Sequence, residues 1–488
     1  MNTSESGEKM SVRDLLGKSI FAVAVSAVCV APAMVAASDF GKRVEDRLNA
    51  RSFKWFGFGS PLQQSANTPQ NMDPGDEAVE VAGKLRVKLV SAEVGVDADM
   101  IALWPDSEHP THAIICNEID GTEAGAAASV QRVELDSGTV SDMVFGLVSC
   151  DPVRRTPWGT VIVGEESGPD GRVYEIFDPL TVTNVQVTHE TGDSSDLTHV
   201  VARTALGQLS YEGIVILPNG ITYYGDELRP STGKAGGGIY KFVPTTLHDG
   251  SPIGNLTESP YVAGSVYVLR LGLRSDGTDY GHGTNSGAGK WIGPLSTESD
   301  LASSATAAGG YTGYYRPEDM ELDPIAWVDG KVRACWANTG NDSQEFWGEV
   351  LCVNDEATAD TSFNTATRPV VTPFLIGNPS LRMPDNLAFQ PHTGILYINI
   401  DATTSAENPE FTNDDVWACL PDGEDTDTLS DGCVRVMTLK DGEAEFTGIE
   451  FLADGKKFLI HLQHRTQEGR AIPNTTDELL ISGIKIRK

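Results

Sequence analysis

Three acidic residues stand at the same position of a unit that recurs along the chain. Glu212, Glu318 and Asp385 each begin a short apolar segment, which is followed by a turn and a second apolar segment. Carboxylates gathered in one water-accessible space repel one another unless cations lie between them, and Ca2+ prefers such oxygen ligands. The pattern therefore predicts a metal site. The alternative is that these acids only cap turns, as Asp and Glu often do.

Two further features support chemistry at the same place. Glu165 and Glu166 follow the apolar segment 161–163, and two carboxylates at a strand end can bridge neighbouring ions. Arg316 comes two residues before Glu318. A guanidinium beside metal-binding acids can hold a tetrahedral anion through two hydrogen bonds, although a structural ion pair is the simpler alternative.

Strands are the elements that would position these residues. Short β-branched and aromatic runs separated by Gly, Asp, Asn and Pro dominate the chain, as in all-β sandwiches, barrels and propellers. The recurring unit is seen at 212–224, 318–336, 385–398 and 447–462, with weaker copies at 156–163 and 264–268. Six such units predict an all-β fold, a six-bladed β-propeller whose innermost strands line one axis. We expect residues 85–488 to form this single domain.

The N-terminal residues 1–37 have the features of a signal peptide. Arg13 and Lys18 precede an apolar run at 20–30, and small residues follow up to Ala37. A retained membrane anchor is the alternative, and only then would the chain contact a membrane. Residues 38–84 are expected to be an N-terminal extension and linker. We therefore expect export, to the periplasm or outside the cell.

Cysteine content indicates the redox compartment of the protein, and net charge limits the partners that it can bind. Of the seven cysteines, all but Cys29 lie outside the predicted signal peptide, and an even number suits an oxidising compartment. Cys335 with Cys352, and Cys419 with Cys433, are close enough in sequence to form disulfides. The formal net charge of −33 repels phosphodiester backbones, so nucleic acid is excluded as a partner.

Several motifs follow one another along the chain: TPWGT (156–160) followed by Glu165-Glu166, LGQLSYEG (206–213), GGIYKFV (237–243), RPEDME (316–321), PDNLAF (384–389), and FTG (446–448) leading to LQH (462–464). In these motifs and in their order the sequence resembles the PhoX family of calcium- and iron-dependent alkaline phosphatases. Together the motifs span most of residues 85–465, and their joint occurrence is far more specific than any one of them.

The resemblance implies a six-bladed propeller that hydrolyses small phosphate monoesters at a mixed iron and calcium cluster. We expect the protein to be a monomer. At the matching positions Arg316 would hold the phosphoryl group, and the implied metal ligands are Cys150, Glu165, Glu166, Glu212, Glu318 and Asp385. A Cys150 thiolate would favour Fe3+, whereas the carboxylates would accommodate Ca2+. The alternative for Cys150 is a disulfide with Cys116. Glu118 and Glu445 are weaker ligand candidates.

Two departures from the family pattern bear on activity. Ala98 stands where the family has an amide, and Asn354 stands where a basic residue is expected; both changes would remove phosphate contacts. Two other functions therefore stay open. One is a calcium-dependent propeller lactonase or esterase, and the other is a non-catalytic propeller that serves as a binding or scaffold protein of the cell envelope.

Overall fold

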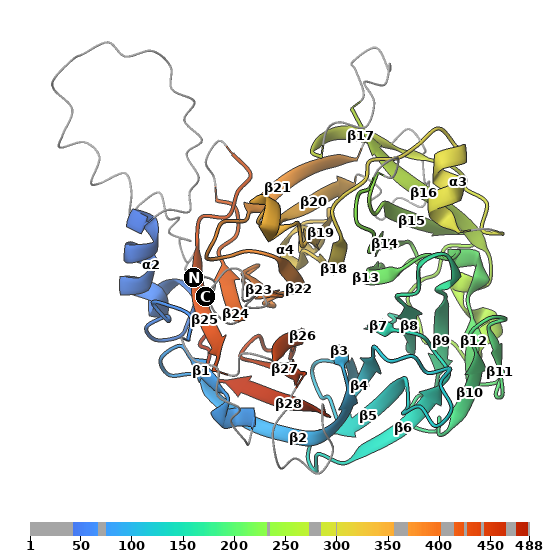
Figure 1. The fold of residues 1–488 in the computed structure, drawn as a ribbon, viewed down its shortest axis with the longest axis horizontal. Helices are drawn as coiled ribbons and strands as arrows, with labels where there is room; N and C mark the ends of the chain where they lie inside the picture. Colours follow the sequence, from blue (N-terminus) through green and yellow to red (C-terminus); the bar gives the residue numbers. More distant parts are fainter. Residues whose placement is uncertain are drawn as a thin grey trace, which may run out of the picture.

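The computed structural model describes residues 42–66, 75–231, 235–272, 285–298, 300–355, 369–401, 414–423, 427–440, 444–464 and 475–486. The predicted signal peptide lies outside these residues. Sheets of mostly antiparallel strands surround a common centre, and only short helices accompany them (Figure 1). Among the described residues, no helix has the length and apolar character needed to cross a membrane.

The strands form five hydrogen-bonded sheets. One contains β3 (Ala98–Trp104), β4 (His112–Asn117), β5 (Val130–Glu134), β6 (Val140–Phe145), β10 (Val185–Thr188) and β11 (Asp193–Ser194). The next contains β7 (Cys150–Arg155), β8 (Thr160–Glu165), β9 (Val173–Phe177) and β12 (Val200–Ala202). The largest contains β13 (Tyr211–Ile216), β14 (Thr222–Asp226), β15 (Ile239–Pro244), β16 (Gly264–Leu271), β17 (Gly287–Ile292), β21 (Val370–Ile376), β20 (Glu349–Asp355), β19 (Val332–Asn338) and β18 (Pro317–Leu322).

The other two sheets combine strands from the two ends of the chain. One contains β22 (Pro384–Phe389), β23 (Leu396–Ile400), β24 (Asp415–Cys419), β25 (Cys433–Leu439) and β1 (Val79–Val81). The other contains β26 (Glu445–Phe451), β27 (Lys457–Gln463), β28 (Thr475–Ser482) and β2 (Arg86–Val96). Because N-terminal strands complete sheets built from C-terminal ones, backbone hydrogen bonds close the ring of sheets.

The helices lie before the first strand or on the connections between strands. They are α2 (Lys42–Trp55), α3 (Leu301–Ala307) and α4 (Pro324–Val328), with the 3-10 turns η1 (Gly75–Glu77), η2 (Gly168–Asp170), η3 (Thr204–Leu206), η4 (Leu256–Glu258), η5 (Pro260–Val262) and η6 (Asp342–Gln344). Helix α2 covers part of the region expected to be an extension or linker, and it packs outside the ring against β25 (Figure 1).

Six strands surround the centre of the ring. Strands β3, β7, β13, β18, β22 and β26 contact one another in this cyclic order, and β26 contacts β3 again (Figure 1). Glycine permits one of these close approaches, since a Cβ added to Gly213 of β13 would lie 1.8 Å from the Met320 backbone nitrogen of β18. The expected all-β propeller-like fold is confirmed.

The sequence repeats were assigned incorrectly at two places. Residues 264–268 belong to β16, which pairs with β15 as an outer strand instead of beginning a new unit. Residues 160–165 form β8, the second strand of its sheet, whereas the innermost strand is β7. The innermost strand β3 was missed. Apolar alternation marks inner and outer strands alike, because both pack between neighbouring sheets.

Each innermost strand has a β-bulge near its start. The register with the second strand shifts between Ala98 and Ile101, Cys150 and Val153, Tyr211 and Ile214, Pro317 and Met320, Pro384 and Leu387, and Thr447 and Ile449. A bulge adds a residue to one strand and redirects its side chains. Five of the bulges carry an acid at their second position: Asp99, Asp151, Glu212, Glu318 and Asp385.

Candidate metal centre

The bulge acids and a few neighbours form two groups of carboxylates on the axis. Asp151 is shared by two sets of three acids, and in each set one oxygen from every residue lies within 4.8 Å of the others. These sets are Asp99 with Glu118 and Asp151, and Asp151 with Glu166 and Glu212. A separate set contains Asp385, Asp401 and Glu445, again within 4.8 Å. The acids come from all parts of the ring, so only the closed fold brings them together.

Two buried oxygen atoms in the first group have no hydrogen-bond donor. The Oδ1 atom of Asp151 and the Oε2 atom of Glu212 are both without a partner, although the residues are only 1% and 5% exposed. Leaving a buried carboxylate oxygen unsatisfied is costly unless it binds a cation. Oxygen atoms that lie this close and lack donors are therefore a suitable donor set for hard ions such as Ca2+.

The pKa values of these acids are raised throughout. Burial, with Asp151 and Glu318 nearby, raises the pKa of Glu212 well above its ordinary value. Burial and the charges of Glu227 and Glu118 raise the pKa of Glu166 to about 10. Burial also raises the pKa of Glu118 to about 7. Bound cations would favour the ionised form of these carboxylates. Carboxylates that repel one another in the absence of ions can therefore form a cation-binding site.

Arg316 lies between the carboxylate groups. Its Nε donates to Glu227, its Nη2 is 3.2 Å from Oε1 of Glu318, and its Nη1 is 3.9 Å from Oδ2 of Asp401. Burial alone would lower the pKa of Arg316, but the charges of Glu318 and Glu227 raise it, so the guanidinium stays charged. Arg316 has φ +53°, a conformation that few non-glycine residues adopt and that is often found at functional sites.

Four of the expected acids and Arg316 meet on the axis, but two expected ligands do not join them. Glu165 instead accepts hydrogen bonds from the backbone of Val148 and Arg172 and lies 2.8 Å from Nδ1 of His189. Neighbouring residues of a strand point to opposite sides, so Glu165 and Glu166 cannot both face the axis. Whether Glu166, Glu212, Glu318 and Asp385 bind metal stays a prediction.

Cys150 forms a disulfide with Cys116, which joins β7 to β4. The expectation of an iron-binding thiolate is thus wrong for this structure, and the alternative pairing is the one observed. A sulfur atom in a disulfide carries no thiolate charge and is a poor metal ligand. The other two expected disulfides, Cys335 with Cys352 and Cys419 with Cys433, are both present.

Neither departure from the family pattern faces the carboxylates. The side chain of Ala98 is fully buried in an apolar cluster, although its neighbour Asp99 reaches the axis. Asn354 lies on β20 and its side chain contacts β21, well outside the innermost strands. The effect of these two positions on phosphate binding stays a prediction.

Several residues of the centre were missed from the sequence or judged weak. Asp99 was missed because the unit containing β3 was not recognised, and Asp151 was missed because the repeat at 156–163 was placed on β8 instead of on the innermost strand β7. Asp401 follows β23, and no motif or repeat position in the sequence indicates that it belongs to the site. The ring nitrogens of His464 lie 3.1 Å from Asp97 and 3.5 Å from Glu445.

A family profile and solved structures match this chain. A family profile described as "Alkaline phosphatase PhoX" matches residues 117–465. The structure is similar to that of Pseudomonas fluorescens PhoX in complex with vanadate, a transition state analogue, with a TM-score of 0.58 and 16% identity over 88% of this chain and 98% of that one. A PQQ-bound aldose sugar dehydrogenase from Streptomyces coelicolor matches at a TM-score of 0.41 and 12% identity, over 83% of this chain and 99% of that one. No curated protein sequence matches significantly.

Proposed function

Because the chain belongs to the PhoX family of alkaline phosphatases, we propose that its acidic centre is the active site of a metal-dependent phosphomonoesterase. The observation that carries the proposal is the convergence of acids from separate innermost strands beside the Arg316 guanidinium. Their residue types suit cations, and the guanidinium suits a phosphoryl group. Small phosphate monoesters are the proposed substrates.

We assign Ca2+ to the carboxylate groups, because all of their donors are oxygen atoms. Asp151, Glu166 and Glu212 would hold one ion, and Asp385, Asp401 and Glu445 another. Fe3+ stays a prediction, and it would have to be bound without the Cys150 sulfur. Bound cations would supply Lewis-acid stabilisation of the phosphoryl oxygens and a stronger nucleophile at moderate pH.

Arg316 has the clearest role among the side chains. Contacts with Glu227 and Glu318 fix its orientation, so its remaining donors are arranged before a substrate arrives. A guanidinium held in this way can donate two parallel hydrogen bonds to phosphoryl oxygens and balance the charge that grows in the transition state. Thr339 donates to Glu318 and helps to hold that acid in place.

Three further expectations belong to the same proposal. We propose six blades, with the nine-stranded sheet as two units joined through β17, because six innermost strands close the ring. We propose that the protein is exported, which three disulfides among the described residues support, since disulfides persist in oxidising compartments. We also propose that it acts as a monomer, which size-exclusion chromatography would test.

The proposal is tested by metal analysis and turnover of the same preparation. We expect the purified protein to contain calcium and to hydrolyse p-nitrophenyl phosphate, to lose this activity in a calcium chelator, and to regain it when calcium is returned. Recovery of activity serves as the control against irreversible unfolding. Turnover of a lactone but of no phosphate ester would indicate a lactonase. Metal-loaded protein that turns over neither substrate class would indicate a non-catalytic propeller.

A further inference from the structure

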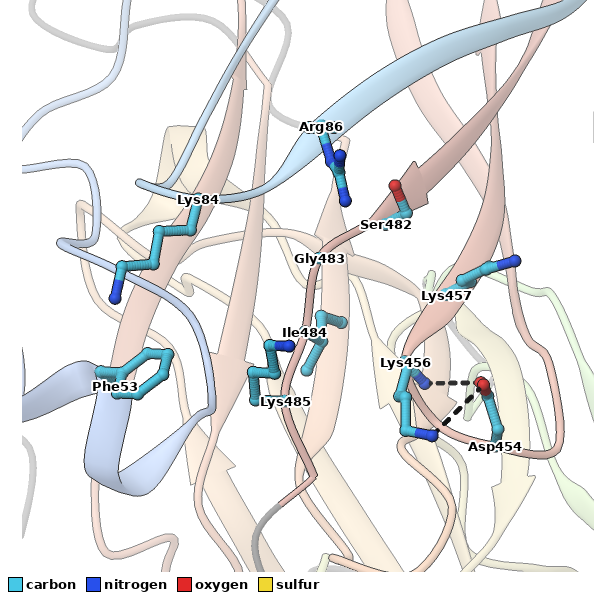
Figure 2. Close-up of a pocket in the computed structure, with 10 residues that line it drawn as sticks. All are labelled: Phe53, Lys84, Arg86, Asp454, Lys456, Lys457, Ser482, Gly483, Ile484 and Lys485. Atoms are coloured by element: carbon cyan, nitrogen blue, oxygen red, sulfur yellow. Dashed lines mark hydrogen bonds and ion pairs between the residues drawn. The ribbon is translucent and has the colours of Figure 1, made fainter.

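A second concave site lies away from the acidic centre. It is a pocket of about 580 Å3, which we call the basic pocket, formed by four segments of the chain (Figure 2). Its lining residues are Phe53, Lys84, Arg86, Asp454, Lys456, Lys457, Ser482, Gly483, Ile484 and Lys485. They come from the end of α2, the start of β2, the β26–β27 turn and the end of β28 with the residues after it.

The basic pocket is separate from the active site proposed above. Strand β26 begins at Glu445, which belongs to the acidic centre, and ends at Phe451 before the turn that lines the pocket. A seven-residue strand spans about 20 Å at about 3.3 Å per residue. The two sites therefore lie at opposite ends of β26, and a ligand in one does not contact the other.

The charge of the basic pocket is opposite to that of the whole protein. The chain carries −33, yet the pocket is lined by five basic side chains and one carboxylate. The carboxylate of Asp454 lies 3.7 Å from Nζ of Lys456, so it is already engaged. Among the described residues, no carboxylate pairs with Arg86, Lys457 or Lys485. Like charges held together without a counter-ion attract anions.

Backbone hydrogen bonds shape the walls of the pocket. The amide of Lys485 donates to the carbonyl of Gly57 at 3.0 Å, and the amide of Gly83 donates to the carbonyl of Ser60 at 2.8 Å. These bonds fasten the segment after α2 to the start of β2 and to the end of the chain. The backbone segments that carry Lys84, Arg86 and Lys485 are therefore held in place before any ligand binds, which reduces the entropy lost on binding.

The lining also offers an apolar surface. The ring of Phe53 lies on one side of the pocket, with Nζ of Lys84 3.8 Å above its centroid (Figure 2). The volume is many times the 30 Å3 or so that one water molecule occupies, so the pocket has room for more than a bare inorganic anion. An ammonium and guanidinium cluster beside an aromatic ring suits an organic molecule that carries a phosphate group.

We propose that the basic pocket binds an organic phosphate, with its phosphate among Arg86, Lys457 and Lys485 and its organic part against Phe53. Such a ligand could be a soluble phosphate compound or the headgroup of an anionic phospholipid. Both present the same phosphate chemistry to the pocket, and the experiment below separates them. Binding here would not be hydrolytic, because the pocket contains no carboxylate group of the kind found on the axis.

The test compares two variants of equal net charge in the full-length protein. Arg86→Gln/Lys457→Gln removes two pocket charges, whereas Lys290→Gln/Lys331→Gln removes two charges elsewhere and serves as the matched control. The soluble probe is methylphosphonate, which a phosphatase cannot hydrolyse, titrated by calorimetry. The membrane probe is cosedimentation with phosphatidylglycerol vesicles, compared with phosphatidylcholine vesicles. Turnover of p-nitrophenyl phosphate is measured for both variants.

We expect the pocket variant to bind at least one of the two anionic probes tenfold or more weakly than the wild type, while the control variant and turnover are unchanged. Loss of the methylphosphonate site alone would identify a soluble ligand, and loss of vesicle binding alone a lipid headgroup. If both probes bind the pocket variant as well as they bind the wild type, or if neither binds the wild type, the proposal is wrong. Because turnover is read separately, this result does not depend on the proposed phosphatase activity.

Discussion

Substitution of Arg316 by lysine tests the proposed active site most directly. The guanidinium meets three acids at once, with distances of 3.2 Å to Glu318 and 3.9 Å to Asp401 in addition to its bond with Glu227. A lysine keeps the charge, but its single nitrogen cannot make these contacts and also donate two bonds to a phosphoryl group. The fold should tolerate the change, because the acids keep a positive neighbour.

The expected loss is in turnover. Removing one preorganised donor from a developing negative charge typically lowers kcat about 100- to 1,000-fold, or roughly 2.7–4 kcal/mol of transition-state stabilisation. We expect Arg316→Lys to lose kcat/KM for p-nitrophenyl phosphate by a factor in this range, with bound calcium unchanged. Kinetics at saturating calcium, together with metal analysis of the same sample, measure both quantities.

A second arginine provides the control. Arg333 forms an ion pair with Asp323 at 2.8 Å, and its side chain is 15% exposed, close to the 19% of Arg316. Arg333 lies on β19, outside the innermost strands. We expect Arg333→Lys to leave kcat/KM unchanged. If Arg316→Lys retains kcat/KM within about threefold of the wild type, or if Arg333→Lys loses as much, the assignment of Arg316 to the phosphoryl group is refuted.

Three further predictions concern ligands, disulfide and buried charge. Asp151→Asn should abolish turnover and lower the calcium content of the protein. Glu165→Gln should keep the wild-type turnover and calcium content, because Glu165 bonds to His189 and to backbone amides. If the two variants lose the same amount of calcium, this prediction is wrong. Cys116→Ser and Cys150→Ser should each lower the unfolding free energy by on the order of 3–4 kcal/mol and leave the metal content unchanged. If Cys150→Ser loses iron and Cys116→Ser does not, Cys150 is an iron ligand after all. Burial raises the pKa of Glu478 from 4.5 to about 8, so ionisation favours the unfolded chain by about 1.4 kcal/mol per pH unit between these values. Glu478→Gln should therefore raise Tm relative to the wild type increasingly from pH 5 to pH 8, and a constant difference across this range would contradict the pKa shift.

The sequence alone predicted a large part of the candidate site. Glu212, Glu318 and Asp385 recur at one position of a repeated unit, and rotation about an axis carries equivalent positions to the same place. The acidic residue types and the neighbouring Arg316 then indicated the chemistry. These inferences need only the order of residues, because the alternation of apolar and polar side chains indicates where strands and turns occur.

Other features depended on the folded chain. Bulges in the innermost strands determine which side chains face the axis, and a bulge leaves no reliable mark in a single sequence. The separation of Glu165 from Glu166, the pairing of Cys116 with Cys150 and the basic pocket all require segments to meet that lie far apart in the chain. Residue types and repeats are thus set locally, whereas the side of a strand that a residue faces, and its neighbours there, are settled only when the sheets close into a ring.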